Sequence, residues 1–91
     1  MNDDTRAQQV QVQQMIDYLM HEVVGRPDIR ISADLPLVSS GLIDSMALVN
    51  ILLKLEDVTD MRIPAGKVQP KDMDTVDLMF ATAQRVGKPR K

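Results

Sequence analysis

The chain has no cysteine and no tryptophan, and its 91 residues include one histidine, one tyrosine and one phenylalanine. Without cysteine it can form neither disulfide bonds nor thiolate metal sites. A single histidine, His21, without cysteine partners also argues against a zinc site. Because aromatic side chains are so few, the core must be aliphatic, with seven methionines available to fill irregular gaps.

A strong charge of either sign is also missing, since 11 basic and 13 acidic residues leave a net charge of -2. That balance argues against a general nucleic-acid binder. No apolar run reaches the ~20 residues of a membrane-spanning helix, and the acidic start at residues 1–4 is unlike a signal peptide. We therefore expect a cytoplasmic protein with neither a membrane span nor a nucleic-acid partner.

The length fits one small domain covering residues 1–91. We expect an ordered core over about residues 5–87 and flexible tails at residues 1–4 and 88–91. The C-terminal tail is basic but short, which is typical of a solvated end.

An amphipathic helix is predicted from about Thr5 to Gly25. Thr5 and Gln8 fit a capping box, and Gly25 followed by Pro27 is a typical stop signal. Between them the apolar residues recur at helical spacing: Val12, Met15, Ile16, Leu19, Met20 and Val23.

The stretch from Gly25 to Ile43 has no regular pattern. It is longer than the ~12–15 residues usual for structureless connections, so it should be functional or held in place by its side chains. Its apolar residues are expected to plug into the bundle: Ile29, Ile31, Leu35, Leu37, Val38 and Leu42.

Two further helical segments are predicted after a helix at about residues 45–58. Pro64 opens a short turn across residues 65–68, which Pro70 should end. Asp74 is the expected N-cap of the last helix, which Gly87 terminates. Its predicted core stripe is Val76, Met79, Phe80, Ala83 and Val86. The predicted fold is all-α, a small four-helix bundle of three main helices and one short helix.

The stretch GLIDSMALVNILLKLED at residues 41–57 is the most informative part of the chain. A glycine turn leads into Asp44 and Ser45, and either side chain can cap the apolar helix that follows. The Ser45 hydroxyl should lie at the positive end of that helix, beside free backbone N–H groups, where a phosphate diester is well placed. The pattern therefore predicts a plain helix cap or a site of modification.

Apolar residues cover about two-thirds of the circumference of this helix, stepped at ~100° per residue. One stripe should face the core: Leu48, Ile51, Leu52 and Leu55. A second stripe, Met46, Val49 and Leu53, lies on the side that carries Ser45. It indicates either a docking surface for partner proteins or a helix buried on most sides, and the sequence leaves both open.

Gly-Leu-Ile-Asp-Ser-Met followed by an apolar helix resembles the acyl carrier protein family, which includes peptidyl and D-alanyl carrier proteins. The resemblance implies a carrier-type bundle with a long loop between its first two helices. It implies 4′-phosphopantetheine on Ser45, with Asp44 as the neighbouring acid that helps bind magnesium during attachment. Ser39 and Ser40 are the nearest alternative attachment sites.

The resemblance implies a carrier and not an enzyme. A stand-alone chain would hold an acyl or aminoacyl group as a thioester, and its partners would be a phosphopantetheinyl transferase, a loading ligase and a downstream synthase or transferase. Fatty-acid carriers have a strongly acidic second helix, whereas this one has only Glu56 and Asp57 at its far end. The difference favours a specialised role, in secondary-metabolite, polyketide, nonribosomal-peptide or aminoacyl chemistry, over housekeeping fatty-acid synthesis. It also favours docking by apolar contacts.

Two other functions compete with the carrier. One is a helical protein–protein interaction module without a prosthetic group, in which Ser45 is only a cap. The other is a serine hydrolase, which the sequence disfavours because Ser45 does not lie in G-x-S-x-G and His21 is on a different predicted helix.

Overall fold

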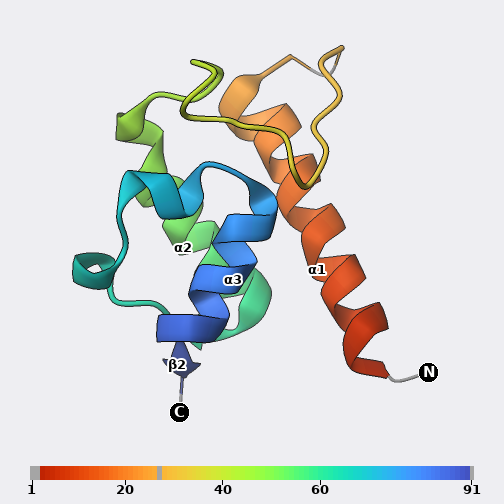
Figure 1. Cartoon of the computed structure of the whole chain (residues 1–91). Helices are drawn as coiled ribbons and strands as arrows, with labels where there is room; N and C mark the ends of the chain where they lie inside the picture. The colour runs from red at the N-terminus through yellow and green to blue at the C-terminus, as the bar shows by residue number, and fades with distance from the viewer. Residues whose placement is uncertain (1–2, 27, 91) are drawn as a thin grey trace.

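A computed structural model describes residues 3–26 and 28–90, with side chains from residue 6 onward (Figure 1). The predicted capping box at the Thr5 side chain, the stop signal at Pro27 and the tail residues 1, 2 and 91 lie outside this description. The elements in chain order are the α-helix α1 (Asp3–Tyr18), the π-helix η1 (Leu19–Val24), the 3-10 turn η2 (Ser45–Ala47), the α-helix α2 (Leu48–Thr59), the strand β1 (Met61–Arg62), the 3-10 turns η3 (Ala65–Lys67) and η4 (Pro70–Met73), the α-helix α3 (Val76–Val86) and the strand β2 (Lys88–Pro89).

The three main helices α1, α2 and α3 contact one another around one aliphatic core (Figure 1). The core stripes predicted for α2 and α3 point inward, with Ile51 and Leu55 fully buried and Leu48 and Leu52 half-buried. Between α1 and α2 runs the long loop, which buries Ile31, Leu37 and Ile43 in the same core. These features confirm the mostly helical fold with a long first loop.

The first helix ends where the sequence predicts, but its last turn is not α-helical. Residues Leu19–Val24 form a π-helix, whose turns are wider than those of an α-helix. Gly25 then adopts the left-handed conformation with φ 68°, which glycine tolerates because it lacks a Cβ. Within the described segments, no helix is long and apolar enough to cross a bilayer.

The short turn predicted after Pro64 is present, but a second 3-10 turn that the sequence did not predict follows it. η3 covers Ala65–Lys67, close to the predicted turn. Pro70 does not end that turn but opens η4, where a missing N–H costs nothing at the first helical position. The Asp72 carboxylate stabilises this start by accepting a hydrogen bond from the Gln69 N–H at 2.8 Å.

The N-cap predicted for the last helix is also wrong by one residue. The side chain of Thr75 accepts the hydrogen bond from the Leu78 N–H at 3.0 Å, and Asp74 lies outside the cap with helical backbone angles. Threonine and aspartate are both good caps, so the local sequence does not distinguish them.

The strand β2 lies at the end of the molecule where α3 stops (Figure 1), and it pairs antiparallel with β1 over two residues. β1 follows α2, β2 follows α3, and Arg62 lies opposite Lys88. Gly87 makes the transition possible, because a Cβ there would collide with the Ala83 carbonyl oxygen and with the Met61 side chain. Helical periodicity in the sequence does not predict this strand pair.

Candidate functional site

The loop that precedes η2 is held by the carboxylate of Asp74, which lies just before α3. Asp74 Oδ1 accepts hydrogen bonds from the backbone N–H groups of Leu37, Val38 and Ser39 at 3.1, 2.8 and 2.9 Å. Its Oδ2 accepts the Ser39 hydroxyl at 2.8 Å. The hydrogen bonds from Ser39, with those from Val38 and Leu37, lower the pKa of Asp74 below its ordinary value despite some burial. The sequence reading assigned Asp74 to a helix cap and missed this anchor.

The anchored loop fixes the backbone just before the Asp-Ser pair. The Leu37 carbonyl accepts a hydrogen bond from the Ile43 N–H at 3.0 Å, and the Ile43 side chain is buried. Between them Gly41 turns the chain with φ 84°, a conformation that favours glycine. A continuous set of contacts therefore runs from Asp74 to the residue that precedes Asp44.

Asp44, and not Ser45, caps the 3-10 turn η2 that leads directly into α2. Its backbone is extended, and its Oδ1 accepts hydrogen bonds from the N–H groups of Met46 at 3.0 Å and Ala47 at 3.1 Å. The sequence left the choice between the two residues open, and the structure decides it. The expectation of free amides beside Ser45 is wrong for these two N–H groups, because the Asp44 carboxylate already binds them.

Ser45 differs from the two alternative serines in what its hydroxyl does. The Ser39 hydroxyl donates to Asp74, and the Ser40 hydroxyl donates to the carbonyl of Pro36 at 2.7 Å. Ser45 is exposed, and within residues 3–26 and 28–90 its hydroxyl makes no hydrogen bond. A group attached at Ser45 would thus displace no contact of the fold, whereas one at Ser39 or Ser40 would break a hydrogen bond.

The second apolar stripe of this helix is on the surface. Met46 is 85% exposed, Val49 66% and Leu53 54%, so the alternative of a helix buried on most sides is wrong. We call these three side chains the α2 stripe. Beside it lies an apolar pocket of about 170 Å³ between α2 and the turns η3 and η4, lined by Leu48, Val49, Leu52, Ala65, Val68, Gln69, Pro70 and Met73.

His21 lies away from Ser45. It is exposed and lines a wide open groove of about 1010 Å³ between the first helix and α2, together with Gln14, Asp17, Tyr18, Glu22, Lys54, Asp57 and Val58. Ser45 is not part of that lining, so the structure does not assemble a serine–histidine pair. In the described part of the chain, no three His, Cys, Asp or Glu side chains are grouped to hold a metal ion.

The family described as "Phosphopantetheine attachment site" matches residues 15–77, which is more than half of the chain. The chain belongs to this family. It is a phosphopantetheine-bearing carrier protein and not a catalyst, which confirms the resemblance and sets aside both the hydrolase and the module without a prosthetic group. Membership implies a phosphopantetheinyl transferase and loading enzymes as partners.

Distant relatives of this carrier are D-alanyl carrier proteins. The chain is 27% identical to the D-alanyl carrier protein of Latilactobacillus sakei subsp. sakei over 75 residues, and this alignment covers 82% of the chain and 96% of the relative. It is 28% identical over 67 residues to that of Lacticaseibacillus rhamnosus, covering 74% and 83%. It is 26% identical over 66 residues to that of Lactococcus lactis subsp. lactis, covering 72% and 84%. No solved structure matches the chain significantly.

Proposed function

We propose that Ser45 carries the 4′-phosphopantetheine of this protein. The observation that supports this most strongly is the contrast among the three serines that lie near the start of α2. Only Ser45 offers an exposed hydroxyl that makes no hydrogen bond within the described residues. In the attachment step the Ser45 Oγ–phosphorus bond forms as the diphosphate bond of coenzyme A breaks, adenosine 3′,5′-bisphosphate is the leaving group, and the hydroxyl proton is released.

Asp44 has a second role in this proposal. Its Oδ1 is used to cap the helix, while its Oδ2 accepts no hydrogen bond from the described residues. A carboxylate oxygen is a suitable ligand for Mg²⁺, which keeps several waters and takes one or two protein carboxylates. Asp44 therefore fixes the start of the helix with one oxygen and offers the other to the magnesium ion of the transferase reaction.

Once attached, the group supplies a thiol on a flexible arm, and the cargo is bound to it as a thioester. The chain's own task is to hold Ser45 at a fixed place and to dock each enzyme in turn, because tethering raises the effective concentration of the cargo. We assign docking to the α2 stripe, for the transferase, the loading ligase and a downstream synthase or transferase. We also propose a cytoplasmic location for the protein.

The cargo we propose is an aminoacyl or acyl group of a specialised pathway. The D-alanyl carrier relatives support the aminoacyl choice. The charges of α2 support a role outside fatty-acid synthesis, since both of its acids are engaged within the chain. Glu56 Oε2 accepts the Ile63 N–H at 2.7 Å, and Asp57 Oδ1 accepts a hydrogen bond from Arg90 at 2.9 Å.

The test is mass spectrometry after incubation with coenzyme A, magnesium and a broad-specificity phosphopantetheinyl transferase. We expect a phosphopantetheine-sized increase on the peptide that contains Ser45. Ser45→Ala should remain folded and unmodified, while the matched control Ser40→Ala should be modified like the parent. Modification of folded Ser45→Ala would refute the assignment.

A further inference from the structure

The exposed face of α2 does not end with its apolar residues. Val49, Leu53 and Asp57 are spaced four residues apart, so Asp57 continues the α2 stripe by one helical turn. Asp60 follows at the C-cap of α2 in the left-handed conformation, with φ 55°. The side chains of Asp57 and Asp60 are 70% and 86% exposed. The docking face thus begins beside Ser45 with apolar side chains and ends with two carboxylates, which we call the acidic end.

The C-terminal segment of the chain folds back onto this acidic end. β2 pairs with β1, which follows α2 directly, and this pairing brings Arg90 within reach of α2. Arg90 Nη2 lies 2.9 Å from Asp57 Oδ1, and Nη1 lies 3.7 Å from Asp60 Oδ1. One guanidinium therefore bridges both carboxylates. The hydrogen bond to Asp57 raises the pKa of Arg90 above its ordinary value, and the charges of Asp57, Asp60 and Glu56 act in the same direction against slight burial.

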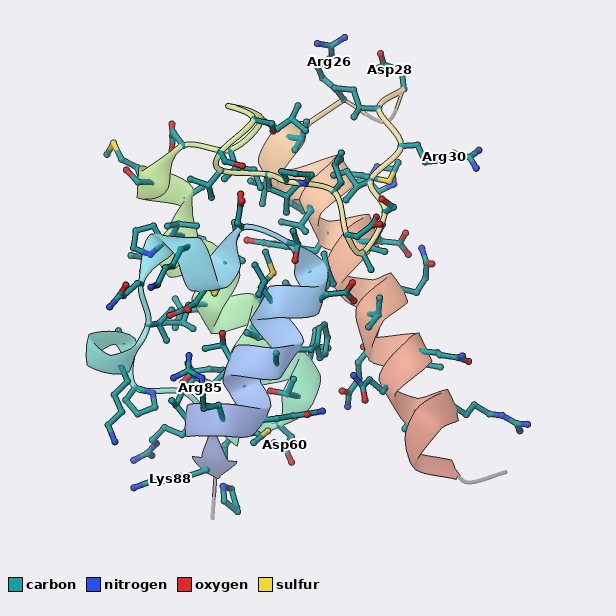
Figure 2. All side chains as sticks on the ribbon, in the orientation of Figure 1. Arg26, Asp28, Arg30, Asp60, Arg85 and Lys88 are labelled. Atoms are coloured by element: carbon teal, nitrogen blue, oxygen red, sulfur yellow. The ribbon has the colours of Figure 1, made fainter. Side chains whose placement is uncertain are left out.

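Lys88 lies on β2, two residues before Arg90, and forms no part of this contact. Figure 2 shows it at the same end of the molecule as Asp60 but directed away from it. Its backbone lies opposite Arg62 across the strand pair, and no carboxylate among the described residues forms an ion pair with it. The contact is therefore made by one particular side chain of the basic tail and does not arise from general attraction between tail and helix.

The ion pairs of Arg90 with Asp57 and Asp60 are weak enough to be displaced. The Asp57 and Asp60 side chains are largely exposed and that of Arg90 is 40% exposed, and exposed ion pairs contribute little to stability because water and salt screen them. The strand pair that supports these ion pairs has two residues on each side, and an isolated two-stranded pair is marginal in water. A second basic group can consequently replace Arg90 without unfolding the helices.

We propose that Arg90 is an intramolecular competitor for the acidic end of the docking face, and that partners with an arginine or lysine side chain at that place must displace it. This inference rests on the proposed docking role of α2. The guanidinium of Arg90 shows which chemistry the two carboxylates accept, since its planar donor fork can bridge both. Competition by Arg90 weakens the binding of basic partners and leaves the binding of partners that dock only on the α2 stripe unchanged.

The experiment uses the full chain with a tri-arginine peptide as the basic probe, and it follows the backbone amide signals of Asp57 and Asp60 by NMR. Arg90→Gln should bind the peptide about two- to fivefold more tightly than the parent, the range that one displaced surface ion pair allows. The matched control Lys88→Gln removes the same charge two residues away in the same basic tail and should bind no more tightly than the parent. Adding Asp57→Asn to Arg90→Gln should abolish the gain.

An Arg90→Gln protein that binds the peptide no better than Lys88→Gln would overturn the inference. A gain that survives Asp57→Asn would overturn it as well, because the peptide would then bind elsewhere. Loading of Ser45 by the transferase, measured on the same samples, separates this result from the proposed function. Normal loading without an affinity gain refutes only the competitor, whereas failure of every folded variant to load refutes the attachment site.

Discussion

Replacing Asp74 with asparagine should destabilise the protein although the side chain is on the surface side of the loop. Asparagine keeps one acceptor oxygen but loses the charge that strengthens the hydrogen bonds from Leu37, Val38 and Ser39. Hydrogen bonds to charged groups contribute roughly 1.5–3 kcal/mol against about 0.5–1.5 for neutral ones. Because this site is only partly buried, we expect a loss of about 1–2 kcal/mol in the free energy of unfolding. For a domain of this size that lowers Tm by roughly 5–15 °C.

The pH dependence of the stability difference between the parent and Asp74→Asn tests whether the carboxylate charge causes it. The pKa of Asp74 is lowered in the folded protein, so its stabilisation is fully present above the ordinary carboxyl value and is lost as pH falls through the lowered pKa. Parent and Asp74→Asn should therefore differ most near neutral pH and converge below about pH 4. The assay is urea denaturation followed by circular dichroism from pH 7 to pH 2.

A matched control is Asp34→Asn in the same loop. The Asp34 carboxylate accepts only the neighbouring Ser32 hydroxyl, at 2.7 Å, among the described side-chain contacts. We expect its free energy of unfolding to change by less than about 0.5 kcal/mol. The reasoning is refuted if Asp74→Asn is no less stable than Asp34→Asn at pH 7, or if its deficit persists unchanged at pH 2.

Three further outcomes follow from the site. Asp44→Asn keeps an acceptor for the cap but not the charge for magnesium, so transferase kinetics should show a loading rate at least about tenfold lower with a nearly unchanged Tm. Leu53→Ser should raise the KM of the transferase for the carrier without much loss of stability, whereas Ile51→Ala, in the core, should cost about 2–5 kcal/mol in urea unfolding. Because the acids of α2 are engaged internally, transferase affinity should depend only weakly on added salt, and a steep dependence would contradict apolar docking.

The sequence predicted those parts of the fold that follow from local periodicity. The spacing of Ile51 and Leu55 identified the inner side of α2, and the Asp-Ser pair identified the start of η2, the 3-10 turn that precedes it. The exposure of the α2 stripe could not be predicted, because a helix with apolar residues on two-thirds of its surface fits both a buried and a docking role. Only the placement of the loop and of η3 and η4 decides which side stays open.

The contacts that the sequence did not predict join residues far apart in the chain. Asp74 reads as a helix cap because it stands just before an amphipathic run, yet its partners Leu37 and Ser39 lie more than thirty residues earlier. The carboxylate of a single aspartate can cap a helix or anchor a loop, and the local sequence is the same in both cases. Arg90 and Asp57 are likewise brought together only by the turn at Gly87 and the two-residue strands.

Among the described residues, the fixed side-chain hydrogen bonds near Ser45 are made by residues other than Ser45. The chain of contacts from Asp74 through Leu37 and Ile43 ends at Asp44, whose carboxylate supplies the cap that a serine would otherwise provide. The Ser45 hydroxyl is therefore free to be esterified without loss of a hydrogen bond of the described fold. A carrier must keep one structure while its cargo is loaded, exchanged and released. In the proposed function, assigning the cap to Asp44 separates the stability of the helix from the chemical state of the serine, and we expect partners to recognise the same α2 stripe at every stage.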